Sequence, residues 1–217
     1  MATILNETNA AEMRAAMVDS QLRTNDVIDP AIVGAMGAVA REAHVPSALA
    51  SVAYMDRAIP LGEGRALNAP LVTGRMLVAA MVRPGMRVLI VGAATGYSAA
   101  CLALLGAEVF ALEDAAGLAA MAPANTSVSW LAGPLAAGAP DRGLFDRIIV
   151  EGAIETLPQA IAGQLVEGGR LVAATRDGAV TRLVQGVKTG GTVALRPFAD
   201  MDVAPLPGFA APKGFQF

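Results

Sequence analysis

The sequence predicts an α/β protein with a mostly parallel, doubly wound sheet, an antiparallel sheet edge and a group of N-terminal helices. From residue 87 onward, short apolar runs alternate with helical segments, and this alternation is typical of a parallel sheet. The runs are apolar at consecutive positions, as strands are when helices cover both faces of a sheet. The last two strand-like runs have no helix between them, which indicates an antiparallel edge.

Length and composition limit the possible classes of protein. The chain has 217 residues, enough for one domain with a sizeable core, and 54% hydrophobic against 16% charged residues exclude a disordered chain. No apolar run reaches the roughly 18 residues that span a bilayer, and "MATILNETNA" lacks a signal-peptide pattern, so we expect a cytoplasmic protein with no membrane partner. A net charge of −3 and the lack of a Lys/Arg cluster argue against nucleic acid as a partner. The oligomeric state stays open.

The first third of the chain is predicted to be helical. "NETNAAEMRAAMVDSQLRTN" has Met13, Met17 and Leu22 at helical spacing. A second helix is expected to start with Asp29 as N-cap and Pro30 at its first position. "AYMDRAIPLGEGRALNAP" is expected to be an irregular loop because of its Pro and Gly residues, and "LVTGRMLVAAMV" a helix that "RPGM" ends. We expect residues 1–66 to pack on a core of residues 67–217 as one structural domain.

The remaining chain gives the strands in order. "RVLIVG", "EVFALE", "SVSWLAG", "FDRIIVEGA" and "GGRLVAAT" are the expected strands of the parallel sheet. "GYSAACLALLG", a segment near "DAAGLAAM", and "LPQAIAGQL" are the expected helices, and "VTRLVQGVK" with "TVALRPF" is the closing pair.

The only cysteine and the only histidine offer little chemistry. Cys101 lies in an apolar helical pattern, so we expect a small buried side chain; a single cysteine also excludes an internal disulfide and a multi-cysteine metal site. His44 has no neighbouring residues in the sequence that suggest a Ser-His-Asp or Cys-His site. We expect neither residue to be catalytic, and no metal.

The turn after the first core strand, Gly92 to Tyr97, is the best candidate for a cofactor loop, since ligands of open parallel sheets bind at such turns. A dinucleotide fingerprint would place its last glycine where Tyr97 stands, whereas Gly96 fits the G-x-G-x-G spacing of S-adenosylmethionine sites. Glu113, at the end of the next strand, can accept hydrogen bonds from both ribose hydroxyls of such a cofactor. A nicotinamide dinucleotide remains an alternative, as does a plain tight turn.

Four segments, by their order and spacing, resemble one family: "MVDSQLRTNDVIDPAIVGAM", "REAHVPSALASVAYMDRAIPLGEGRALNAPLVTGRML", "PGMRVLIVGAATGYSAACLALLGAEVFALED" and "FDRIIVEGAIETLPQAIAGQLVEGGRLVAAT". They cover most of the chain and are similar to the N-terminal helices, the segment leading into the core, the cofactor-binding half and the fourth and fifth strands of protein-L-isoaspartate O-methyltransferases. The resemblance implies the Rossmann-like, S-adenosylmethionine-dependent methyltransferase fold.

The resemblance also implies an activity. The family transfers a methyl group from S-adenosylmethionine to the α-carboxylate of an L-isoaspartyl residue in a damaged protein or peptide, and the ester then cyclises to a succinimide. Because the acceptor is already an anion and the donor a sulfonium cation, the reaction needs alignment and water exclusion more than a general base. A chain with one histidine and no metal cluster permits such a reaction.

The resemblance assigns roles to particular positions. The loop from Ala66 to Asn68 would close on the substrate, with Asn68 at the catalytic position, and Glu151 and Gly152 would also face the substrate. Glu151 and Glu155, after the fourth strand, would flank the pocket mouth in this fold, and a solvated helix start is an equal alternative for this acidic pair. The expected cofactor-binding residues are Leu67, Gly92, Ala93, Ala94, Gly96, Glu113, Asp114, Pro134 and Leu135.

Four positions depart from the family pattern. Asn68 replaces a serine, Ile90 an acid of the first strand, Ala94 the middle glycine, and Pro134 an aspartate that helps hold adenine. Proline offers neither a carboxylate nor a backbone N–H. The alternative is therefore a methyltransferase-fold protein that binds S-adenosylmethionine but has another acceptor or no repair activity. The role of the Pro- and Phe-rich tail, "DVAPLPGFAAPKGFQF", is left open.

Overall fold

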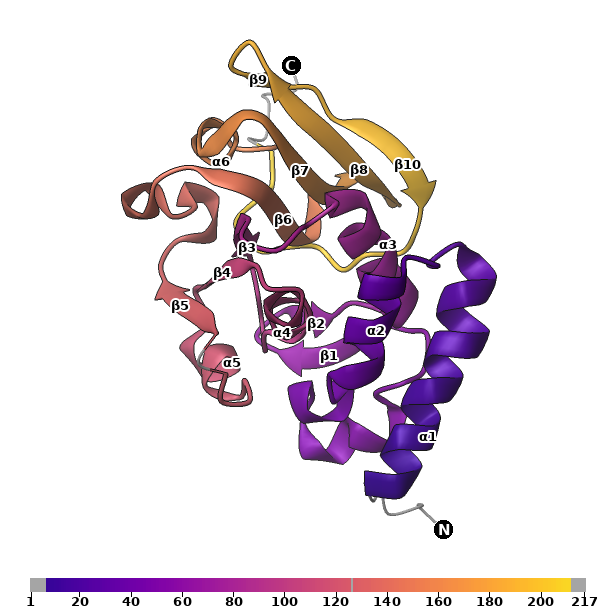
Figure 1. Ribbon diagram of the computed structural model, residues 1–217. Helices are drawn as coiled ribbons and strands as arrows, with labels where there is room; N and C mark the ends of the chain where they lie inside the picture. Colours follow the sequence, from indigo (N-terminus) through magenta and orange to yellow (C-terminus); the bar gives the residue numbers. More distant parts are fainter. Residues whose placement is uncertain (1–6, 126, 212–217) are drawn as a thin grey trace.

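The computed structural model describes residues 7–125 and 127–211 and is built on an eight-stranded sheet (Figure 1). The strands lie in the order β10-β8-β7-β6-β3-β4-β5, and β9 pairs with β8. Strands β3 to β7 pair in parallel with their neighbours, whereas β8 runs antiparallel to both β7 and β10. The predicted α/β class and its antiparallel edge are confirmed.

The strands of this sheet are β3 (Arg87–Val91), β4 (Glu108–Glu113), β5 (Val128–Ala132), β6 (Phe145–Ile154), β7 (Leu165–Asp177), β8 (Val180–Thr189), β9 (Thr192–Val193) and β10 (Arg196–Asp200). The chain leaves β3 toward β4 on one side and later returns to β6 on the other. The switch point of the sheet therefore lies at the C-terminal end of β3, where ligands of open α/β sheets bind.

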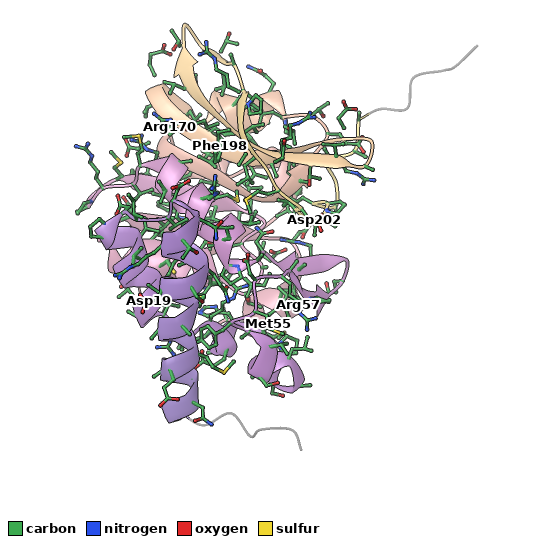
Figure 2. All side chains as sticks on the ribbon, turned by 90° about the vertical axis from the view of Figure 1, so that its right-hand side faces the viewer. Asp19, Met55, Arg57, Arg170, Phe198 and Asp202 are labelled. Carbon is green, nitrogen blue, oxygen red and sulfur yellow. The ribbon has the colours of Figure 1, made fainter. Side chains whose placement is uncertain are left out.

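The helices are α1 (Glu7–Met17), α2 (Pro30–Ala38), α3 (Pro70–Ala80), α4 (Tyr97–Leu104), α5 (Ala116–Ala120) and α6 (Gln159–Gly163). Helix α2 begins as predicted, because the Asp29 side chain accepts hydrogen bonds from the N–H groups of Ala31 and Ile32. The first expected helix divides into α1, a π-helical turn (Val18–Leu22) and a 3₁₀ turn (Arg23–Asn25). Figure 2 shows Asp19, Met55 and Arg57 on the N-terminal part, below Arg170 and Phe198 on the sheet.

Side chains of β3 alternate between two hydrophobic clusters, one on each face of the sheet. Val88 and Ile90 pack in the cluster that contains the N-terminal helices and α4, and Leu89 and Val91 pack in the cluster that contains α6. All four side chains are fully buried, which explains why the strand is apolar at consecutive positions. Ile90 therefore belongs to the core.

One expectation about local structure was wrong, and one predicted helix is shorter than expected. The expected irregular loop contains a hairpin of β1 (Ile59–Gly62) and β2 (Arg65–Leu67), in which Ile59 pairs with Leu67. Gly62, Glu63 and Gly64 all have positive φ, so the residues that suggested an irregular loop form its tight turn. The expected helix "LPQAIAGQL" is only five residues long, and β7 begins at Leu165.

The described part of the C-terminal tail crosses the end of β6. Ala153 donates its N–H to the carbonyl of Ala204 at 2.8 Å, and Leu206 donates its N–H to the carbonyl of Ala153 at 2.9 Å. Leu206 and Phe209 are buried in the α6 face of the core. We call residues 203–209 the C-terminal strap; the last six residues of the chain lie outside the described part.

Candidate active site

The β3–α4 loop has three residues in the left-handed region of backbone conformation. Gly92, Ala94 and Gly96 have φ values of 74°, 50° and 77°. Ala94 is the unusual member, because a side chain makes this conformation unfavourable by about 1–2 kcal/mol. Its N–H donates to Glu113 Oε2 at 2.6 Å, so Glu113 holds the loop in its strained form.

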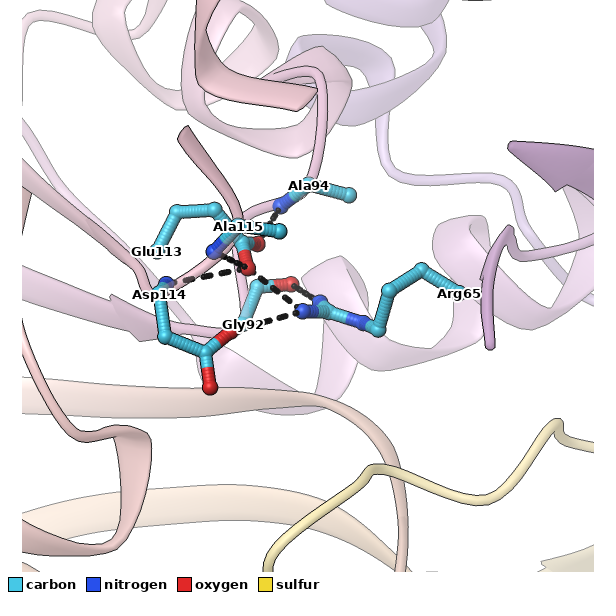
Figure 3. Close-up of polar contacts among 6 residues, drawn as sticks. All are labelled: Arg65, Gly92, Ala94, Glu113, Asp114 and Ala115. Carbon is cyan, nitrogen blue, oxygen red and sulfur yellow. Dashed lines mark hydrogen bonds and ion pairs between the residues drawn. The ribbon is translucent and has the colours of Figure 1, made fainter. Parts of the chain in front are cut away.

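Glu113 is the centre of a buried polar network (Figure 3). Its side chain has no exposed surface, and its Oε1 accepts a hydrogen bond from Arg65 Nη1 at 2.5 Å. The N–H groups of Asp114 and Ala115 donate to the same oxygen at 3.1 and 3.2 Å. Arg65 also donates from Nη2 to the carbonyl of Gly92 at 2.7 Å. The guanidinium thus joins the hairpin, the glycine loop and the end of β4.

A second polar cluster lies at the ends of β2 and β6. Asn68 is buried, and its Nδ2 donates to Glu151 Oε2 at 2.9 Å. The Asn68 carbonyl accepts a hydrogen bond from the buried Arg41, which also donates to the carbonyl of Ala53. Arg41 lies over the ring of the buried Tyr97. These contacts fix the loop that carries Asn68.

The Glu151 carboxyl has an unusual environment. Its Oε1 is buried and has no hydrogen-bond partner among the residues the structure describes. Burial raises the pKa of Glu151, and the neighbouring Ser98, Asn68, Arg41 and Arg65 offset this only in part. The group therefore keeps its proton to a higher pH than an exposed glutamate.

The other sequence-predicted site residues fall into two groups. Ala66, Leu67, Ala93 and Asp114 lie beside the two polar clusters, and Gly152 lies under Leu206 of the strap. Pro134 and Leu135 follow β5 and are not brought to either cluster. Pro134 lines a pocket with Leu112 and Trp130, and Leu135 is buried in the core.

Arg65 and Arg41 were missed by the sequence analysis, which left the role of the tail open. The signal that could have found Arg65 is the single cation in "LGEGRALN", three residues before the expected catalytic position Asn68. Arg41 and the strap have no comparable local signal, because their contacts join residues far apart in the chain. Glu155, the other acid of the pair with Glu151, accepts a hydrogen bond from the N–H of Ala211.

Cys101 is buried, as expected, and His44 is hydrogen-bonded to the β3–α4 loop. His44 Nδ1 lies 2.6 Å from the carbonyl of Thr95, and burial lowers the pKa of its ring. Cys101 is buried, and burial raises the pKa of its thiol to about 12. Within residues 7–125 and 127–211, no cluster of three or more His, Cys, Asp or Glu residues could hold a metal ion. The helices of the described residues include none that is long and apolar enough to span a bilayer.

Comparison with known proteins identifies relatives over most of the chain. Residues 12–207 match the family described as "Protein-L-isoaspartate(D-aspartate) O-methyltransferase (PCMT)". A protein-L-isoaspartate O-methyltransferase of Methylorubrum populi is 44% identical over 170 residues, covering 76% of this chain and 79% of the relative. One from Koribacter versatilis is 35% identical and covers 96% of both chains.

Solved structures have the same fold. A protein-L-isoaspartate O-methyltransferase matches with a TM-score of 0.78 at 20% identity, over 90% of this chain and 66% of that one. A Plasmodium falciparum protein, titled a putative protein-L-isoaspartate O-methyltransferase in complex with S-adenosyl-L-homocysteine, matches with a TM-score of 0.76 at 19% identity. It covers 89% of this chain and 97% of its own.

Proposed function

The chain belongs to the protein-L-isoaspartate(D-aspartate) O-methyltransferase family, and from this premise we propose that it methylates the carboxylate of L-isoaspartyl residues in damaged proteins and peptides. It is a methyltransferase, and its cofactor is S-adenosylmethionine. The observation that carries the proposal is the juxtaposition of the Gly92–Gly96 loop with Glu113 at the switch point of the sheet. The resemblance recognised in the sequence is thereby confirmed.

The loop and Glu113 have the positions that an adenosyl cofactor requires. Gly92 and Gly96 let the loop take its left-handed turns at the end of β3, and Glu113 is the acid for the ribose. The pocket lined by Leu112, Trp130 and Pro134 lies beside them and offers a place for the adenine ring. The residues fit the cofactor on one condition: Arg65 must first release Glu113.

Asn68 is proposed to orient the acceptor. S-adenosylmethionine supplies a methyl group on a cationic sulfur, and the acceptor carboxylate needs only to be aligned with it. The amide Nδ2 of Asn68 carries two hydrogens, and one is used by Glu151. The other can donate to the carboxylate of the isoaspartyl residue.

Glu151 is proposed to tune the charge of the acceptor site. An ionised carboxylate beside Asn68 would repel the substrate carboxylate, and burial opposes that ionisation by raising the pKa of Glu151. The protonated form presents a donor in place of a negative charge. The hairpin β1–β2 and the C-terminal strap cover this region and help to exclude water.

A methyl-transfer measurement tests the proposal. Purified protein is incubated with methyl-labelled S-adenosylmethionine and either an isoaspartyl peptide or the same peptide with normal aspartate. We expect label only in the isoaspartyl peptide, and a loss of at least about tenfold in Asn68→Ala, the cost of one charge-assisted hydrogen bond. Asn25→Ala, which removes an exposed amide far from the site, is the control and should keep wild-type activity. Label in neither peptide would contradict the proposal.

A further inference from the structure

The hydrogen-bonding capacity of Glu113 is almost used up by the protein itself. A carboxylate has about four acceptor positions, two on each oxygen. Oε1 already accepts from Arg65, Asp114 and Ala115, and Oε2 accepts from Ala94. With no exposed surface on the side chain, Glu113 cannot accept both ribose hydroxyls while Arg65 is bound.

Arg65 also fills the space over the glycine loop. A methyl group added to Gly92 would lie 2.9 Å from Arg65 Nη2 and 2.9 Å from Leu206 Cδ1. The guanidinium therefore packs directly on the loop, together with the C-terminal strap. It also places a positive charge where a cationic cofactor has to bind, and it neutralises the carboxylate that would attract that cofactor.

The structure offers Arg65 a second partner close by. Asp114 Oδ1 lies 3.7 Å from Arg65 Nη1, and the Asp114 side chain is half exposed. A solvent-open cavity of about 300 Å³ is lined by Glu63, Arg65, Asp114, Ala115 and Pro207. The guanidinium can turn into this cavity and pair with Asp114 instead. Its positive charge therefore does not remain buried without a partner when it leaves Glu113.

We propose that Arg65 gates the cofactor site by competing with the ribose hydroxyls for Glu113 and moving to Asp114 when the cofactor binds. This inference rests on the proposed function, since it assumes that the ligand is an adenosyl cofactor. Arg65 is a positioning residue that sets the affinity for the cofactor through Glu113. Removing its guanidinium strengthens cofactor binding, although it removes an ion pair.

Calorimetric titration tests the gate without a turnover measurement. Wild type, Arg65→Met and Arg65→Lys are titrated with S-adenosylhomocysteine and with an analogue that lacks both ribose hydroxyls. We expect Arg65→Met to bind S-adenosylhomocysteine at least about tenfold more tightly than wild type, the scale of one charge-assisted hydrogen bond, with little change for the analogue. Arg65→Lys keeps a competing cation and should stay close to wild type. Arg182→Gln, which breaks the exposed pair with Asp200, is the matched control and should change neither affinity.

Several results would overturn the gate. One is that Arg65→Met binds S-adenosylhomocysteine no more tightly than wild type. Another is that its affinity for the analogue without ribose hydroxyls rises as much as its affinity for S-adenosylhomocysteine. The third is that neither wild type nor any variant binds S-adenosylhomocysteine. If Arg65→Met does not fold, a crystal structure of the wild-type complex decides: ribose oxygens on Glu113 with Arg65 at Asp114 support the gate, and Arg65 still on Glu113 refutes it. A gain in affinity without methylation of an isoaspartyl peptide by any variant would leave the gate standing and refute the proposed function.

Discussion

Replacing Gly96 with alanine tests how the glycine loop is packed. Gly96 has φ of 77°, and a Cβ at this position would lie 2.8 Å from Cζ2 of Trp130. Alanine in the left-handed region destabilises the folded state by about 1–2 kcal/mol. Alanine also reduces the conformational entropy of the unfolded chain, which offsets about 0.4–1 kcal/mol of this loss. The clash adds about 1–3 kcal/mol of overpacking, so we expect Gly96→Ala to lower the free energy of unfolding by about 1–5 kcal/mol.

The matched control is Gly85→Ala. Gly85 has nearly the same φ, 78°, and no atom lies within 4 Å of an added Cβ, so only the backbone cost of about 1 kcal/mol remains. Urea denaturation gives both free energies of unfolding, and Trp130, the single tryptophan, reports the clash through its fluorescence. We expect an emission shift in Gly96→Ala alone. Equal destabilisation of the two variants, or unchanged fluorescence in Gly96→Ala, would refute the reasoning.

Three further predictions concern the acceptor cluster and the buried thiol. Asn68→Ser should lower the free energy of unfolding by about 1–3 kcal/mol, because the buried carboxyl of Glu151 loses its amide donor, while methyl transfer persists through the hydroxyl. Unchanged stability in urea denaturation would contradict the role of that hydrogen bond. The pKa of Glu151 is raised in the folded protein, so its protonated form stabilises the fold. This contribution is complete below the pKa of the unfolded chain, about 4.3, and is lost as the pH rises through the pKa of the folded protein. Glu151→Gln should therefore become more stable relative to wild type as the pH rises. Above the pKa of Glu151 in the folded protein, this variant should also have a lower KM for an isoaspartyl peptide than wild type. A difference in melting temperature between the two proteins that does not vary with pH would refute this. Cys101, with a pKa of about 12, should resist a thiol reagent at neutral pH until the protein is unfolded, and rapid labelling of the folded protein would show that the core is open there.

The fold could be predicted from the sequence because the sheet has strong local signals. Consecutive apolar residues such as Val88 to Val91 occur where a strand is covered on both faces, and Asp29 with Pro30 marks a helix start. The hairpin was missed because Pro60 and the turn glycines are typical of irregular loops as well as of short strand pairs. Local sequence cannot distinguish these two outcomes.

The candidate site could be predicted only in part. Spacing led to the glycine loop and Glu113, and the resemblance led to Asn68 and Glu151, which the structure brings within hydrogen-bond distance. The Arg65–Glu113 pair could not be predicted, since 48 residues separate its members and an arginine in a loop is usually exposed. Long-range pairing of polar groups depends on the assembled fold and leaves no periodic pattern in the sequence.

The most direct test of the proposed activity is to locate the transferred methyl group by tandem mass spectrometry. An isoaspartyl peptide that also contains a normal aspartate is incubated with the protein and S-adenosylmethionine, then fragmented. The account predicts one added methyl group, carried by the fragment that contains the isoaspartyl residue, followed by loss of methanol as the succinimide forms. A methyl group on any other fragment, or no methyl group at all, would contradict it.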